Sequence, residues 1–171
     1  MKHILTVIAA LLVMAGLAAA QATFTIVTGT ETPIRLANPG EVKCHGGLPT
    51  GNPLAPCPPG TSGTVRGQQR ILQEDTLDAR TNGLNYGTFN ANIHEDGTLN
   101  AWGTFRLEVS GGGVWEGVWE GKQAADGSFS YSVTGHGSGG SVEHLQLLWD
   151  GTYPAGSFVA TIKARILTPG K

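Results

Sequence analysis

The clearest structural signal in this chain is the stretch Gly112-Gly113-Val114-Trp115-Glu116-Gly117-Val118-Trp119-Glu120-Gly121. Its tryptophans alternate with charged or small residues, which is typical of a β-strand with one buried face. Similar runs, separated by short glycine-rich turns, continue outward to residue 82 and to residue 167. Connections of two to about six residues join neighbouring antiparallel strands. The sequence therefore predicts an antiparallel β-meander.

Eight strands are expected along the chain. They are placed at residues 23–28, 64–77, 86–93, 99–109, 115–122, 129–134, 142–149 and 158–166. A long meander exposes two unpaired edges unless it closes, and glycines within strands are typical of bends and close approaches. We therefore predict an all-β fold, an eight-stranded antiparallel up-and-down barrel, with an open two-sheet sandwich as the alternative. The odd-numbered positions from Leu99 to Val133 are expected to point inward.

Residues 1–22 have the organisation of a secretory signal peptide, with a basic start, an apolar run and small residues at the end. An Ala-x-Ala pattern ends at Ala20 and another at Ala22, and the second is favoured because an extended segment follows at once. Cleavage there leaves residues 23–171 as one domain. An uncleaved membrane anchor is the alternative, but the apolar run is marginal in length for a spanning helix. We expect a secreted or periplasmic protein.

The two cysteines, Cys44 and Cys57, are predicted to form a disulfide, because thiols pair in exported proteins. They lie in residues 29–63, where seven prolines exclude a long regular element, so a long stapled loop is expected there, with at most a short extended piece near residues 34–36. A metal site that includes His45 is the alternative. It is disfavoured because adjacent residues rarely point at one ion.

The charge of the chain bears on its partners. The formal net charge is −2, and no cluster of lysine or arginine follows the signal peptide. Nucleic acid and, after cleavage, membrane are therefore not expected as partners.

Aromatic side chains on the inward face are the candidate ligand-binding residues. They are Trp115, Trp119, Phe105, Tyr131 and Trp149. Gly117 lies between the first two tryptophans and leaves an open slot that would hold a ring or chain. In the alternative interpretation both tryptophans fill the core, and the glycine admits a side chain from the facing strand.

Other chemistry is less well supported by the sequence. Glu116 and Glu120 lie roughly 13 Å apart on one strand, too far for a glycosidase pair, and are expected on a solvated outer face. His136 and His144 flank a turn near Glu143 but lack a clear third metal ligand, so no metal is predicted. No serine-nucleophile elbow and no phosphate-binding loop is present. The catalytic residues cannot be assigned.

Three segments carry a family resemblance: the Trp-Glu-Gly-Val-Trp-Glu-Gly strand, the turn at residues 135–140, and Leu145-Gln146-Leu147. Over residues 64–167 the chain resembles the allene oxide cyclase barrel-like and dirigent-like superfamily. The resemblance implies an eight-stranded barrel without metal or organic cofactor, whose relatives steer cyclisation or coupling of small hydrophobic molecules in the lumen. No catalytic residue of these relatives matches a position here, and the Pro-rich N-terminal loop departs from their pattern.

Two functions follow as hypotheses. In the first, the barrel binds a small hydrophobic ligand in its lumen and, as an enzyme, cyclises or isomerises it by shape and orientation. In the second, the protein is a non-catalytic extracellular module that holds a glycan or a protein through the stapled loop or the exposed Trp102.

Overall fold

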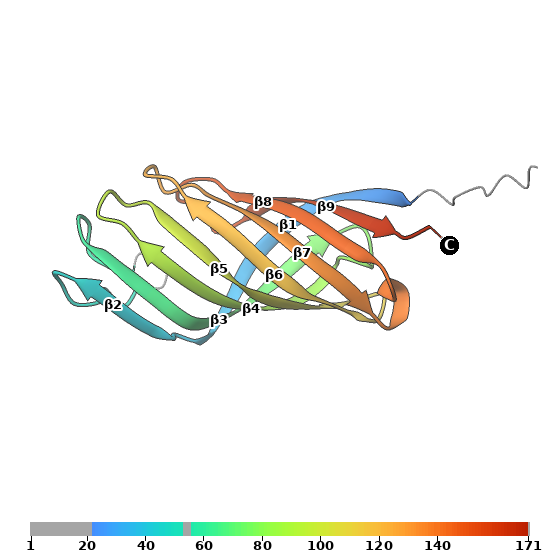
Figure 1. The fold of residues 1–171 in the computed structure, drawn as a ribbon, viewed down its shortest axis with the longest axis horizontal. Coiled ribbons are helices and arrows are strands. Elements are labelled where there is room, and N and C mark those ends of the chain that lie inside the picture. Colours follow the sequence, from blue (N-terminus) through green and yellow to red (C-terminus); the bar gives the residue numbers. More distant parts are fainter. Residues whose placement is uncertain (1–21, 53–55, 171) are drawn as a thin grey trace, which may run out of the picture.

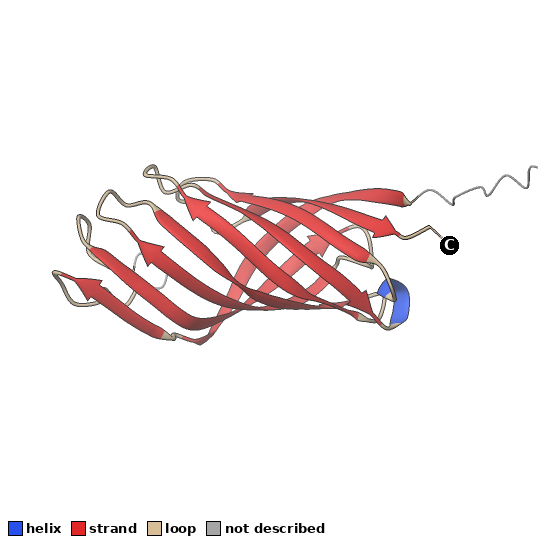
Figure 2. Cartoon of the chain, viewed as in Figure 1, coloured by secondary structure: helices blue, strands red, loops and turns tan. Residues whose placement is uncertain are grey.

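The computed structural model describes residues 22–52 and 56–170, and these form a β-barrel (Figures 1 and 2). The predicted signal peptide lies outside the described residues apart from Ala22. The strands are β1 (Thr23–Asn38), β2 (Glu41–His45), β3 (Ser62–Thr76), β4 (Gly83–Ile93), β5 (Leu99–Val109), β6 (Val114–Gln123), β7 (Phe129–Ser138), β8 (Gln146–Tyr153) and β9 (Ala160–Thr168). A single 3₁₀ turn, η1 (Gly140–Val142), precedes β8.

Strand β1 closes the barrel. The neighbours run β1-β9-β8-β7-β6-β5-β4-β3-β2, and β1 also pairs with β3. Its first part, Thr23 to Glu31, is antiparallel to β9, while Gly29 to Asn38 is antiparallel to β3. The predicted closed, eight-stranded antiparallel barrel is therefore confirmed. The ninth strand, β2, lies beyond the closed part and pairs with the start of β3, at the left in Figure 1.

The predicted inward face is confirmed in the central strands. On β5, Leu99, Ala101, Phe105, Leu107 and Val109 are buried, and the residues between them are exposed apart from the half-buried Gly103. Strand β7 alternates in the same way. One face of each strand thus builds the core, and the other meets solvent.

The prediction that residues 29–63 form a loop without a long regular element was wrong for its first part. Strand β1 continues to Asn38, and β2 follows after a break at Pro39 and Gly40. Pro33 is tolerated in this strand because the pairing of β1 with β9 ends at Glu31. Beyond Glu31 the side of β1 that faced β9 forms no ladder hydrogen bonds, so the missing N–H of proline costs none. The register shifts twice between Pro33 and Asn38. Bulges therefore accommodate residues that a regular ladder would exclude.

The turn between β7 and β8 was also placed too early. Strand β7 runs to Ser138, and β8 begins at Gln146 rather than at Val142. Val142 instead ends the 3₁₀ turn, where it is fully buried. Gly137 allows this packing, because a Cβ there would lie 2.0 Å from the Val142 carbonyl oxygen.

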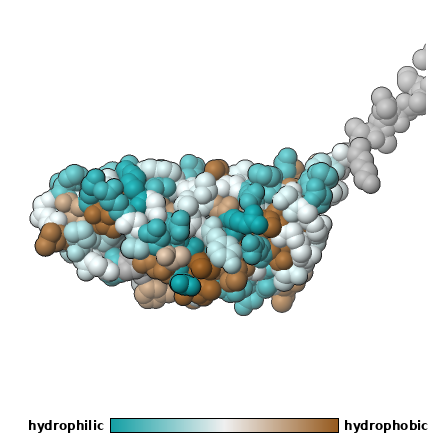
Figure 3. Space-filling view, turned by 90° about the horizontal axis from the view of Figure 1, so that it is seen from below, coloured by the Kyte–Doolittle hydropathy of each residue, from teal (hydrophilic) through white to brown (hydrophobic). Residues whose placement is uncertain are grey.

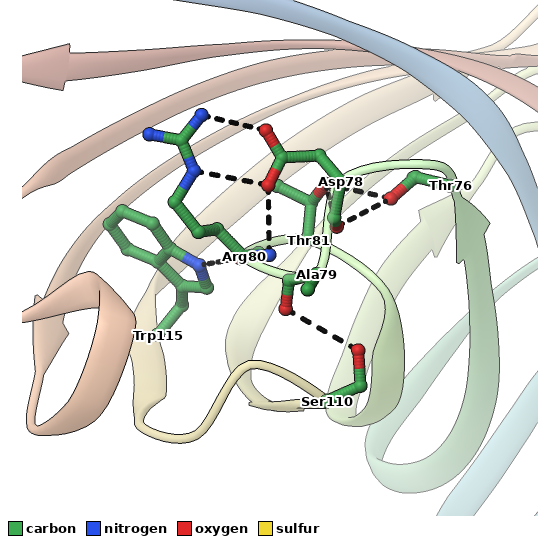
Figure 4. A network of polar contacts seen from close by, with 7 residues as sticks. All are labelled: Thr76, Asp78, Ala79, Arg80, Thr81, Ser110 and Trp115. Carbon is green, nitrogen blue, oxygen red and sulfur yellow. Dashed lines mark hydrogen bonds and ion pairs between the residues drawn. The ribbon is translucent and has the colours of Figure 1, made fainter.

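The end of the barrel near the C-terminus is closed by Trp115. Its indole Nε1 donates to the Arg80 carbonyl oxygen at 2.6 Å, across to the β3–β4 turn (Figure 4). Arg80 in turn pairs with Asp78 at 2.7 Å, and Thr76 donates to the Asp78 carbonyl oxygen at 3.0 Å. This turn therefore has a fixed shape beneath a fully buried tryptophan.

The predicted disulfide is confirmed, since Cys44 and Cys57 are bonded. The bond joins β2 to the segment that precedes β3. Gly63 of β3 lies against it, and a Cβ at Gly63 would lie 2.5 Å from the Cys57 sulfur. Disulfides persist in oxidising compartments. The bond therefore indicates an environment of extracellular type.

The outer face carries scattered apolar residues. Phe24, Ile26 and Val118 are each more than half exposed, and brown and teal residues are interspersed over the face in Figure 3. Scattered exposure of this kind is ordinary for a folded protein.

Candidate functional site

The barrel contains a cavity of about 390 Å³. It extends from mid-barrel to the end where the β6–β7 and β8–β9 turns lie, and Gly127, Gly156 and Phe158 of those turns belong to its lining. Pro56, next to Cys57, also contributes to it. The opposite end is filled by the core that includes Trp115. The cavity is thus a pocket with one end blocked.

Three of the five predicted ligand-binding residues line this pocket: Phe105, Trp119 and Tyr131. Trp115 and Trp149 are not part of the lining and pack in the adjoining core. The predicted slot beside Gly117 is occupied, because a Cβ at that glycine would lie 2.9 Å from the ring of Phe105. The alternative interpretation, a glycine that admits a side chain of the facing strand, holds at this position.

Aromatic rings form the wall of the pocket. Phe89 stacks on Trp119 with ring centroids 5.5 Å apart, and Phe129 stacks on Tyr131 at 5.9 Å. The Trp119 indole is fixed because its Nε1 donates to the Thr88 carbonyl oxygen at 3.0 Å. An aromatic wall with few freely rotating side chains is typical of sites for small apolar molecules.

Polar side chains gather at mid-barrel, in a part of the cavity that the sequence did not predict. Glu31 and Glu74 are direct partners across β1 and β3, and both point inward and are buried. Tyr153 donates to Glu31 Oε1 at 2.5 Å, and Asn85 Nδ2 donates to Glu74 Oε1 at 2.8 Å. Glu31, Asn85 and Tyr153 line the pocket, while Glu74 lies behind them. We call Glu31, Glu74, Asn85, Tyr131 and Tyr153 the polar floor.

The two carboxyl groups of the polar floor are placed to share one proton, because they are buried cross-strand partners. Like charges directly opposite each other destabilise a sheet, and burial removes the water that would screen them. Burial and the neighbouring Glu31 raise the pKa of Glu74 well above its ordinary value, and burial also raises that of Glu31. No N–H or O–H group of the described residues donates to Glu74 Oε2. A protonated Glu74 that donates to Glu31 accounts for both observations.

Arg70 supplies the positive charge beside the polar floor. Its guanidinium lies 4.1 Å above the centre of the Phe89 ring, and its Nε donates to Gln68 Oε1 at 2.5 Å. Burial lowers the pKa of Arg70 to about 10, and the attraction of Tyr153 and Glu31 opposes this change. At neutral pH the guanidinium is charged and balances one carboxylate at Glu31.

Three further polar atoms near the polar floor are buried and have no well-formed hydrogen bond to any described residue. They are Asn85 Oδ1, the Tyr131 hydroxyl and Trp149 Nε1, and the last two are neighbours. Tyr131 lies close to the Glu31 carboxyl and is held by contact with Gly151, where a Cβ would lie 2.2 Å from its ring. Buried polar groups are nearly always satisfied, by protein, water or ligand. A ligand with a polar group fits this end of the pocket.

Sequence reasoning missed the polar floor for a specific reason. Glu31 lies in the Pro-containing segment that was predicted to be a loop, so it was not assigned a face. Glu74 lies in the strand whose alternation was imperfect. The sequence does contain one signal for Glu74. It is separated by even numbers of residues from Gln68 and Thr76, which are buried on the same face of β3.

The remaining candidates lie on the outside. Glu116 faces solvent and pairs with Arg106 at 2.6 Å, and Glu120 is exposed, as predicted. Trp102 is 40% exposed, with the Arg66 guanidinium 5.1 Å above its ring. Within residues 22–52 and 56–170, no three His, Cys, Asp or Glu side chains are grouped as metal ligands.

Comparison with known proteins adds no assignment. No family model, no curated protein and no solved structure matches this chain. Among the described residues, no helix has the length and apolar character needed to span a membrane. The geometry of the pocket is therefore the basis for assigning a function.

Proposed function

We propose that the protein binds a small, mainly hydrophobic molecule in the lumen of the barrel, with a polar group of that molecule at the polar floor. The observation that carries the proposal is the cavity of about 390 Å³, blocked at one end, with aromatic walls and unsatisfied polar atoms at mid-barrel. Apolar pockets with a few convergent polar groups are the usual form of small-molecule sites. The resemblance to the allene oxide cyclase barrel-like superfamily points to the same class of ligand.

The place of action that we propose is outside the cytoplasm, as a secreted or periplasmic protein. The Cys44–Cys57 bond supports an oxidising compartment. The signal peptide predicted at residues 1–22 supports export.

Binding is tested with N-phenyl-1-naphthylamine, a neutral apolar dye whose fluorescence rises in dry surroundings. Gly87 lines the pocket, and a Cβ there would meet Leu72 at an unstrained 3.6 Å. Gly87→Leu therefore fills the lumen without forcing the backbone. We expect the wild type to bind the dye and the variant to lose roughly 10-fold or more in affinity, because the new side chain occupies the same volume.

The matched control is Val118→Leu, which adds a methylene on the exposed outer face of β6. Its dye affinity should equal that of the wild type. Equal affinity in Gly87→Leu and wild type would refute lumenal binding. It would favour the second hypothesis, an extracellular module that holds a glycan or protein through the outer surface around Trp102.

A further inference from the structure

We propose that the polar floor is a proton-transfer site, at which the protein isomerises a small hydrophobic ketone by moving a hydrogen from a carbon beside the carbonyl group. This inference rests on the proposed lumenal binding and adds a reaction to it. Two features of the floor carry it: a base, and a hydrogen-bond donor for the carbonyl oxygen.

The base is Glu31. Its carboxyl lines the pocket and is 5% exposed. Because Glu74 behind it carries the shared proton, Glu31 is the carboxylate of the pair. A carboxylate in dry surroundings is a stronger base than one in water, since burial disfavours the charged form.

The donor is the Tyr131 hydroxyl. Tyr131 lines the same pocket, and its buried hydroxyl lies beside the Glu31 carboxyl and the Trp149 indole without a hydrogen bond of good geometry to either. A carbonyl oxygen that accepts from Tyr131 brings the adjacent C–H bond to Glu31. The hydroxyl then stabilises the negative charge that develops on that oxygen. Asn85 Oδ1 also lacks a hydrogen bond, so the polar group of the ligand is expected at this end of the pocket.

The reaction balances within the pocket. Glu31 removes a proton from the carbon, the electron pair of the C–H bond forms a carbon–carbon double bond, and the carbonyl π electrons move to the oxygen held by Tyr131. Glu31 then returns this proton, or one exchanged with solvent at the open end of the pocket, to the same carbon. In a β,γ-unsaturated ketone the proton goes to the γ-carbon instead, which shifts the double bond into conjugation. No oxidant, reductant or second substrate is consumed.

Glu74 is a positioning residue rather than a catalytic one. It is fully buried, is not part of the pocket lining and contacts Glu31 as its cross-strand partner. The proton on Glu74 keeps the two carboxyl groups at a total charge of −1. Asn85 Nδ2 donates a hydrogen bond to Glu74 Oε1. Gln at this position reproduces both contacts, since its amide donates to Glu31 and its carbonyl oxygen accepts from Asn85.

The test follows hydrogen exchange in 2-tetralone, a bicyclic ketone with exchangeable hydrogens beside its carbonyl group. The ketone is incubated with the folded protein in D₂O, and loss of the methylene signals is recorded by proton NMR. We expect the wild type to accelerate exchange and Glu31→Gln to lose roughly 100-fold or more of that acceleration, the usual contribution of general base catalysis. Tyr131→Phe should also slow exchange, since the charge that develops on the ketone oxygen loses its hydrogen-bond donor.

The control is Glu116→Gln, the same substitution on the outer face, which should exchange at the wild-type rate. Displacement of N-phenyl-1-naphthylamine by 2-tetralone reports binding separately from chemistry. If the ketone displaces the dye but exchanges equally fast in wild type and Glu31→Gln, proton transfer is refuted while ligand binding stands. If the ketone displaces no dye, and the dye itself binds equally to wild type and Gly87→Leu, lumenal binding fails and the inference fails with it.

Discussion

Glu74 makes the stability of the barrel depend on pH, because its carboxyl is fully buried opposite Glu31. Burial and the neighbouring carboxyl raise the pKa of Glu74 in the folded state. The stabilising contribution of the protonated form is complete below the unfolded pKa, near 4.5, and is lost as the pH rises toward the folded value. Stability should therefore fall as the pH is raised from about 4.5.

Glu74→Gln is expected to remove most of this dependence. The amide is uncharged at every pH and keeps the bond from Asn85. In thermal unfolding followed by circular dichroism, the variant should melt several degrees above the wild type at pH 8, and the difference should shrink at pH 4.5. A variant that melts below the wild type at pH 8 would contradict a protonated Glu74.

At the scale of single residues, the lining of the pocket could be predicted where apolar and polar residues alternate regularly along a strand. Phe105, Trp119 and Tyr131 face the pocket because parity alone determines their side of the sheet. Trp115 and Trp149 share that parity but lie nearer the blocked end, and position along the barrel axis depends on stagger between strands. Stagger is not encoded in the alternation of any one strand.

At the scale of the element, β1 shows why Glu31 could not be predicted as a residue of the site. Prolines and bulges hide its period, and its pairing changes from β9 to β3 near Glu31. A strand that closes a barrel bonds with elements at both ends of the domain, so its partners are set by the whole fold. The inward direction of Glu31 follows from that pairing.

The glycines of β6 and β7 are predicted to be essential for strand packing. A Cβ at Gly117 would lie 2.0 Å from the Thr134 carbonyl oxygen, whereas one at Gly87 would meet only ordinary contacts. We expect Gly117→Ala to lower the free energy of unfolding by about 1 to 3 kcal/mol, the usual cost of overpacking. Gly87→Ala is the control and should be neutral or slightly stabilising in urea denaturation. Equal effects of the two substitutions would refute the close approach.

At the scale of the whole molecule, the closed barrel and the disulfide stabilise different parts. The ladder of β1 and β3–β9 closes on itself, while β2 pairs only with β3 and lies beyond the closure. The Cys44–Cys57 bond fixes β2 and places Pro56 in the pocket lining. The sequence predicted this bond from cysteine number and export alone.

Removal of the disulfide should therefore affect stability and the pocket together. The double variant Cys44→Ser, Cys57→Ser is expected to lose about 3 kcal/mol of unfolding free energy in urea, because the unfolded chain gains the freedom of the opened loop. N-phenyl-1-naphthylamine should also dissociate faster in a stopped-flow measurement, since Pro56 is no longer held in the lining. The reduced wild type serves as the control and should match the double variant in both measurements. An unchanged dissociation rate alongside the expected loss of stability would show that the staple supports β2 and has no part in retaining the ligand.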